Sequence, residues 1–498
     1  MTCLIISTKQ LLHDERAPEA GARVGRGPAA PTGPLSPAPE ILGHECRVSS
    51  ALLSGLLPSQ GNVYTLTPLT DAKGFTKILV ASLQRKVYCL EYTHGRPCMR
   101  DVPFTYIPGG AEIVSIDAVN RSIIQEDFII GITIIKKDDT TGQQSHFFNI
   151  YSDWDLNSDS ALDVVSQNCL PLELDFVPYH LYHTKTLGKN GWETVWLLSG
   201  SDCTIHLYQS DDESHSYQEV EGSQSFPEFK FVDGITLWMD ISYTQESKRR
   251  VTVTCGEGGN VHMFHVNAEN TPEVISSRCI LWDYPVSSAK VFSSANFLRT
   301  PFFLEDILRL QKQESPRNED ELSIVVGTTL ESCFVYRDFA KAQKGFRLPE
   351  SDANDAVTCC IVCDIDQDGI NEILMGTYGQ VVLVYKWIQK TSEWILYHTV
   401  SLPCPVLSLA YCDVMGDDHS FLCSSRFLRP STRPTSPTFR EFIAGTTVAN
   451  NPFSETCVQF HSSVLAPSPT FSSSIFPWSH ADYIDWSSSS WLFRPHVL

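Results

Sequence analysis

The chain has 498 residues, with 37 Lys and Arg against 58 Asp and Glu, and its formal net charge is −21. An acidic excess of this size argues against nucleic-acid binding and against a polybasic membrane patch, because both need lysine and arginine in excess. No apolar run approaches the ~18 residues that span a bilayer, and the apolar stretch at residues 3–6 is too short for the core of a signal peptide. We therefore expect a soluble, intracellular protein, whose 42% of hydrophobic residues suits a globular core.

Residues 1–58 form the first segment, and their composition sets them apart. Residues 17–40 (APEAGARVGRGPAAPTGPLSPAPE) consist mainly of alanine, proline and glycine. Such a stretch cannot bury enough apolar surface to offset the entropy lost on ordering. We predict a low-complexity, disordered N-terminal segment.

Residues 59–423 form the body, in which a unit of two apolar runs recurs. The first run ends in a small residue, a polar turn follows, and the second run alternates and carries a late aromatic residue. The copies are 78–82 with 87–92, 128–131 with 147–151, 195–200 with 205–208, 251–256 with 261–264, 322–327 with 333–336, and 373–376 with 381–385. This pattern predicts strand, turn, strand. The small residue, often glycine, allows a turn or a close backbone approach.

The same units indicate the fold class. Three copies are preceded by an apolar–Asp–apolar stretch that we predict to be a strand, centred on Asp117, Asp240 and Asp366. Units of three or four strands that repeat at ~50 residues are typical of a β-propeller. We predict an all-β propeller with about seven blades, and we weigh two β-sandwiches as the alternative. We expect little helix, with residues 303–311 as the best candidate.

The stretch from Asp364 to Glu372 (DIDQDGINE) is the one motif with ligand chemistry. Carboxylates at alternate positions around a tight turn converge, and Ca²⁺ takes six to eight oxygen ligands. An EF-hand is excluded because its twelfth position is Met375 instead of glutamate. We name Asp364, Asp366, Asp368 and Glu372 as candidate ligands of a structural calcium ion. The alternative is a turn in which the aspartates cap backbone N–H groups without any metal.

Two further groups of residues are weaker candidates for metal binding. Cys359, Cys360 and Cys363 lack a second pair at zinc-site spacing and lie in an apolar run, so we interpret them as free core cysteines. A second, eroded acidic motif at 413–418 lacks the closing acid.

Residues 424–498 form a tail with 16 Ser, 8 Pro and no Lys, which we predict to be disordered. The two terminal segments are nearly neutral, so the acidity belongs to the body. The sequence leaves open whether the last blade is complete before this tail begins.

Two resemblances follow from these residues. The acidic stretch between two predicted strands is similar to the FG-GAP repeats of integrin α subunits. Several strings between residues 59 and 418 resemble the kaptin family in the same order. They are SQGNVY at 59–64, YIP at 106–108, AEIVSID at 111–117, LSG at 198–200 with IHLY at 205–208, VYRD at 335–338, and DIDQDG at 364–369 with TYGQ at 377–380.

The kaptin resemblance implies a non-enzymatic scaffold subunit with no catalytic residue and no required cofactor. Its partners would be an FG-GAP-containing propeller subunit and the other KICSTOR subunits. That complex tethers a GATOR assembly to lysosomes and restrains mTOR kinase signalling when nutrients are scarce. The resemblance also implies an alternative, association with F-actin in lamellipodia and stereocilia.

Other function classes find less support in the sequence. An enzyme is disfavoured because the chain lacks G-x-S-x-G, H-E-x-x-H, P-loop and G-x-G-x-x-G motifs. An extracellular receptor of integrin type would need a signal peptide and several full acidic repeats. Direct actin binding would need a local basic patch such as residues 248–250, which we interpret as a solvated turn between strands.

Overall fold

The structure is a computed structural model, and it describes only part of the chain. The described residues are 2–7, 45–47, 53–56, 59–93, 96–122, 124–138, 140–153, 162–188, 191–211, 216–244, 248–269, 271–293, 322–337, 345–366, 368–388, 390–414 and 421–426. The candidate helix at 303–311, most of the second acidic motif at 413–418 and nearly all of the predicted tail lie outside this set.

Six blades follow one another along the chain, each built on four consecutive antiparallel strands. Blade 1 has β4 (Leu66–Thr70), β5 (Thr76–Ala81), β6 (Val87–Thr93) and β7 (Arg96–Val102); blade 2 has β8 (Ala111–Asn120), β9 (Phe128–Lys137), β10 (Gln144–Ser152) and β11 (Cys169–Leu174). Blade 3 has β12 (Pro178–Gly188), β13 (Gly191–Gly200), β14 (Ile205–Asp211) and β15 (Ser216–Val220); blade 4 has β16 (Thr236–Thr244), β17 (Arg249–Gly256), β18 (Asn260–Asn267) and β19 (Glu273–Leu281). Blade 5 has β20 (Val286–Ser293), β21 (Leu322–Thr328), β22 (Phe334–Arg337) and β23 (Phe346–Arg347); blade 6 has β24 (Val357–Cys363), β25 (Glu372–Thr377), β26 (Val381–Ile388) and β27 (Glu393–Ser401).

A seventh blade joins strands from both ends of the described chain. Its order is β28 (Val406–Cys412), β29 (Phe421–Arg426), β1 (Thr2–Ser7) and β3 (Leu53–Leu56). In its register, residue 5 of β1 lies opposite residue 423 of β29 on one side and residue 53 of β3 on the other. A further strand, β2 (Glu45–Arg47), pairs in parallel with β27 at the outer edge of blade 6. The last blade, whose completion the sequence left open, therefore has four strands, two of them from within residues 1–58.

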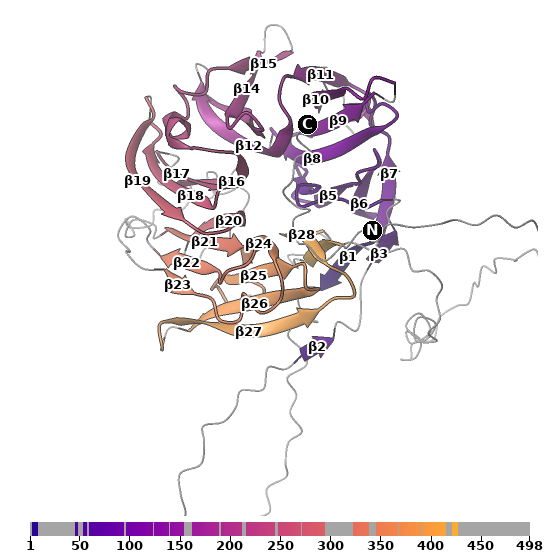
Figure 1. The fold of residues 1–498 in the computed structure, drawn as a ribbon. Helices are drawn as coiled ribbons and strands as arrows, with labels where there is room; N and C mark the ends of the chain where they lie inside the picture. The colour runs from indigo at the N-terminus through magenta and orange to yellow at the C-terminus, as the bar shows by residue number, and fades with distance from the viewer. Residues whose placement is uncertain are drawn as a thin grey trace, which may run out of the picture. The chain divides into compact units, whose positions relative to one another are not determined.

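The blades close into a ring (Figure 1). The inner strands contact one another in chain order, from β4 through β8, β12, β16, β20 and β24 to β28, and β28 contacts β4. Among the described residues, the helical segments are the short α2 (Leu162–Val165) and the 3-10 helix η1 (Pro227–Phe231). The prediction of an all-β propeller is confirmed. No helix among the described residues is both long and apolar enough to cross a membrane.

The repeat found in the sequence corresponds to the second and third strands of blades 1 to 6. Each predicted pair of runs forms an antiparallel pair, for example β5 with β6 and β25 with β26. The second strand is covered on both faces and so reads as a continuous apolar run, as β9 does. The outer strand of blade 4, β19, alternates between exposed and partly buried residues because only one face packs on the blade.

In blades 2 and 6 the glycine that ends the first run allows close packing between blades. A Cβ atom at Gly131 of β9 would lie 2.7 Å from Leu181 Cδ2 on β12. A Cβ atom at Gly376 of β25 would lie 2.6 Å from Val406 Cγ1 on β28. At Gly131 and Gly376 the inner strand of the next blade approaches the glycine, so close approach explains the small residue at these two positions.

Two of the three predicted apolar–Asp–apolar strands are inner strands that bind the next blade. Asp117 of β8 accepts a hydrogen bond from the backbone N–H of His183 on β12 (2.7 Å). Asp240 of β16 accepts one from the backbone N–H of Val291 on β20 (2.8 Å). The third prediction was wrong, since β24 ends at Cys363 and Asp366 lies in the loop that follows.

The cysteines of β24 belong to the core. Cys359, Cys360 and Cys363 are buried and form no disulfide. Burial raises the pKa of the Cys359 and Cys360 thiols to about 12. The interpretation of this cluster as packed, free thiols is confirmed, because a buried thiol with a raised pKa is neither a ready nucleophile nor a ready metal ligand.

Candidate functional site: the acidic loop of blade 6

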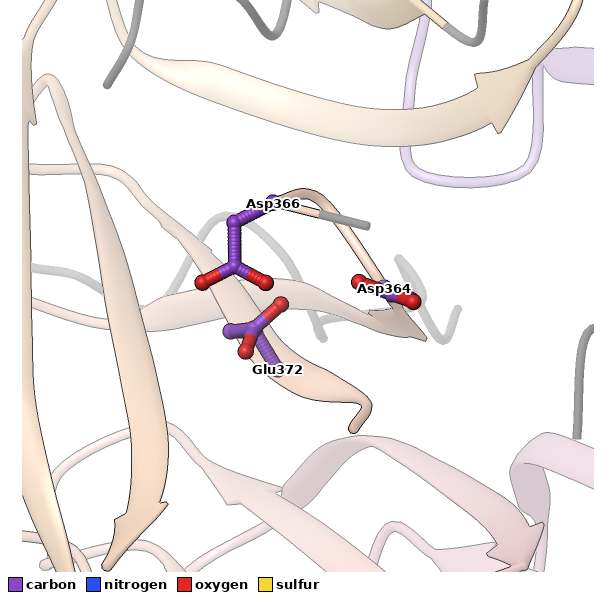
Figure 2. Close-up of side chains that lie close together, drawn as sticks. All are labelled: Asp364, Asp366 and Glu372. Carbon is purple, nitrogen blue, oxygen red and sulfur yellow. The ribbon is translucent and has the colours of Figure 1, made fainter. Parts of the chain in front are cut away.

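The acidic loop connects the first two strands of blade 6. Cys363 at the end of β24 lies opposite Glu372 at the start of β25, so the residues between them form the connection. Gly369 has a φ of +87°, a left-handed conformation that glycine adopts without strain. One carboxylate oxygen from each of Asp364, Asp366 and Glu372 lies within 4.8 Å of the other two (Figure 2).

Asp364 shapes the turn through backbone hydrogen bonds. Its Oδ1 accepts the N–H of Asp368 at 3.1 Å, and its Oδ2 accepts the N–H of Gly369 at 2.8 Å. Its carbonyl oxygen accepts the hydroxyl of Tyr411, from β28 of blade 7, at 2.6 Å. Asp364 therefore does what the metal-free alternative predicts, since its side chain caps the N–H groups of the turn.

Lys386, on the third strand β26, reaches the remaining carboxylates. Its Nζ forms ion pairs with Asp366, with Asp368 Oδ2 at 2.6 Å and with Glu372 Oε1 at 3.1 Å. The Lys386 side chain is 13% exposed, and the Glu372 side chain is fully buried. The ammonium also lies 5.8 Å from the ring centre of Tyr397 on β27. One lysine thus neutralises part of the charge of three acids.

The pKa values follow from this arrangement. Burial raises the pKa of Glu372 to about 7, and the neighbouring Asp366 adds to the increase. Burial alone would lower the pKa of Lys386, but hydrogen bonds to Asp366 and Asp368 outweigh it and raise that pKa. For Asp368, burial acts to raise the pKa, but the bonds from Lys386 and the Ile370 N–H outweigh it, so the pKa falls below its usual range.

The loop brings three of the four predicted ligands together, Asp364, Asp366 and Glu372, and the fourth, Asp368, joins them through its ion pair with Lys386. Carboxylate oxygens are the donors that calcium prefers, and in that respect the residues suit the ion. The Lys386 ammonium, however, lies among Asp366, Asp368 and Glu372, where a cation would be placed. With the lysine in this position, the donor set does not fit a bound divalent cation. Structural calcium stays a prediction from the sequence alone.

The sequence prediction missed Lys386. The residue lies 14 positions beyond Glu372 and one position beyond the strand that we predicted as far as Tyr385, and β26 continues to Ile388. In the hairpin, Ile373 of β25 lies opposite Tyr385 of β26, which places Glu372 beside Lys386. The available signal was this cross-strand register, since residues opposite each other in an antiparallel pair lie about 5 Å apart.

The basic triplet at 248–250 is not a free cationic patch. The Arg250 side chain is 1% exposed and forms a two-bond ion pair with Glu228, whose side chain is fully buried. Lys248 is exposed, and its Nζ lies 3.9 Å from Glu269. The expectation of a wholly solvated turn was wrong for Arg250, because the apolar face of Phe226 and the carboxylate of Glu228 hold it inside.

Comparison with known proteins settles the family. The model of the family described as KICSTOR complex protein kaptin matches residues 55–424. The chain belongs to the kaptin family. Its similarity to KICSTOR complex protein kaptin of Mus musculus is 35% identity over 370 residues, which cover 72% of this chain and 81% of the mouse protein. The kaptin match spans the six consecutive blades and the C-terminal strands of the seventh.

Two of the solved structures that match show a distant similarity to this member of the kaptin family. BBS1N in complex with ARL6DN is 9% identical with a TM-score of 0.41, covering 75% of this chain and 94% of that one. The WD40 repeats of RRP9 are 11% identical with a TM-score of 0.41, covering 74% and 96%. Similarity of this degree adds nothing to the description of the fold.

Proposed function

We propose that this chain is a non-enzymatic scaffold subunit of a KICSTOR-like complex. In this role it recruits a GATOR assembly to lysosomes and restrains mTOR kinase signalling when nutrients are withdrawn. The observation that carries the proposal is the kaptin-family match, which extends over residues 55–424 and therefore over most of the propeller.

The propeller itself supports a scaffold role. Its blades are joined to their neighbours by specific polar contacts, such as Asp117 to His183 and Asp240 to Val291. The acidic groups of blade 6 are engaged with backbone N–H groups and with Lys386. These groups serve the fold, so the loop is better explained as a structural connection than as a reactive centre.

The partners and location follow from the same proposal. The chain would pair with an FG-GAP-containing propeller subunit and with further KICSTOR subunits, and would contact GATOR within that assembly. It would be cytoplasmic and reach the lysosomal surface through the complex.

A cytoskeletal role in lamellipodia and stereocilia, through F-actin, is the second candidate. Actin is acidic, so a direct contact with the acidic body would need exposed positive charge. The basic triplet at 248–250 offers less of it than its sequence implies, because Arg250 is buried against Glu228. This arrangement favours the scaffold role over direct filament binding.

Affinity purification of the endogenously expressed chain tests the proposal. We expect recovery of a second propeller subunit together with GATOR components, and recovery of actin alone would refute the scaffold role. Lys248→Glu is a suitable variant, because Lys248 is the exposed residue of the triplet, whereas Arg249 is partly buried and Arg250 is buried. The scaffold role predicts unchanged partner recovery with Lys248→Glu, whereas direct actin binding predicts weaker cosedimentation with filaments.

A further inference from the structure

We propose that Lys386 is the built-in cation of the acidic loop and takes the place that a metal ion would hold in a D-x-D-x-D-G turn. The proposal concerns how blade 6 is held together, and it stands apart from the scaffold role. It predicts that the fold of this chain does not depend on calcium.

The position of the ammonium is the first support. Lys386 Nζ contacts carboxylates from the middle of the loop, Asp366 and Asp368, and from the start of β25, Glu372. A metal ion in such a turn links the same two parts, the bend and the closing acid. The lysine therefore makes the connection that defines the site, and it does so from a third strand of the same sheet.

The rigidity of that position is the second support. Lys386 lies on β26 directly after residues paired with both neighbouring strands, and it faces Ile395 of β27 in the register. Its side chain is largely buried, and the ring of Tyr397 flanks the ammonium. A lysine held by a central strand, beside an aromatic face, is not free to swing into solvent and vacate the site.

Electrostatic repulsion prevents the Lys386 ammonium and a divalent cation from occupying this site together. A divalent cation bound to the oxygens of Asp366 and Glu372 would lie within a few ångströms of the Lys386 ammonium. Repulsion between cations at that separation is strong in a partly buried environment. Lysine and calcium are therefore alternatives, and removing the lysine charge should leave a cluster of acids that either repel one another or collect a cation from solution.

Thermal unfolding of the purified full-length chain, with calcium chloride or a chelator added, tests whether Lys386 takes the place of calcium in the acidic loop. We expect the parent melting temperature to be the same in both conditions. Lys386→Met should melt several degrees lower in chelator, whereas Lys386→Arg, which keeps the charge, should stay near the parent. Lys390→Met is the matched control, because Lys390 is an exposed turn lysine of the same blade, and it should melt like the parent.

A charge-removal cycle separates electrostatics from packing. Adding Asp366→Asn to Lys386→Met should restore part of the lost melting temperature, because fewer negative charges then repel one another. The same double variant provides folded protein if Lys386→Met alone is insoluble. A saturable calcium stabilisation of the parent would overturn the proposal. So would a Lys386→Met variant that melts like Lys390→Met, or a double variant whose loss equals or exceeds the sum of the two single losses.

Discussion

Replacing Arg250 by alanine should be among the most damaging single changes outside the apolar core. The guanidinium donates from Nε to Glu228 Oε1 at 2.9 Å and from a terminal nitrogen to Oε2 at 2.8 Å. The same terminal nitrogen donates to the Ser225 carbonyl at 2.9 Å, and the group lies 4.2 Å from the ring centre of Phe226. Without Arg250, the fully buried Glu228 carboxylate would keep one side-chain donor, the Thr252 hydroxyl.

The size of the effect follows from that stranded charge. Breaking a buried ion pair by removing one partner costs about 3–5 kcal/mol, whereas replacing both partners by apolar groups is often near neutral. At ~2 °C per kcal/mol for a large domain, Arg250→Ala should melt about 6–10 °C below the parent. The double variant Arg250→Met with Glu228→Leu should recover most of this loss.

Thermal and urea unfolding of the parent, Arg250→Met, Glu228→Leu and the double variant measure the coupling between the two residues. Lys248→Ala is the control from the same turn, because an exposed ion pair contributes at most about 1 kcal/mol. A loss of stability in Arg250→Ala no greater than that in Lys248→Ala would contradict a buried, stranded carboxylate at Glu228. So would a double variant whose loss equals the sum of the two single losses, because the stranded charge would then not be the cause.

Three further changes have defined outcomes. Burial lowers the pKa of His180 to about 4. The free energy of unfolding should therefore be highest above about pH 6.5 and lower by about 2 kcal/mol at pH 5, because the unfolded chain takes up the proton more readily. His180→Asn should weaken the dependence of the urea midpoint on pH, and an unchanged pH profile would contradict this. Gly376→Ala should lower the free energy of unfolding by about 1–3 kcal/mol through overpacking. Gly258→Ala, whose Cβ would have its nearest neighbour 3.8 Å away, should change it by under about 0.5 kcal/mol in urea unfolding, and equal losses would contradict close packing between blades. Iodoacetamide should modify exposed Cys203 well before buried Cys360 in the folded protein, as mass spectrometry of timed samples would show, and early labelling of Cys360 would refute its place in the core.

The strand pairs of blades 1 to 6 could be predicted because each is local. A second strand such as β9 is mostly apolar, its partner follows within the same blade, and its glycine marks where the next blade approaches. The seventh blade could not be predicted in this way, because β1 and β29 pair across more than 400 residues and neither carries the full repeat. The short apolar stretch at residues 3–6 was visible, but sequence periodicity cannot show which distant edge a single strand will join.

The acidic loop was predictable in its residue types and not in its electrostatics. Alternating aspartates around a glycine indicate a tight turn with converging oxygens, and Asp364, Asp366 and Glu372 do converge. What fills the space between them depends on the register of β25 with β26, which places Lys386 beside Glu372. The role of Arg250 was hidden for a similar reason, since its partner Glu228 lies on a 3-10 helix with no periodic signal.

The most direct test of the scaffold role is the amount of GATOR on purified lysosomes after amino-acid withdrawal, in cells with and without this chain. If the chain is a KICSTOR-like subunit, its loss should remove GATOR from the lysosomal fraction and leave mTOR kinase signalling active, and re-expression should reverse both changes. Lysosomal GATOR that stays the same after complete loss of the chain, with normal suppression of the kinase, would contradict the role.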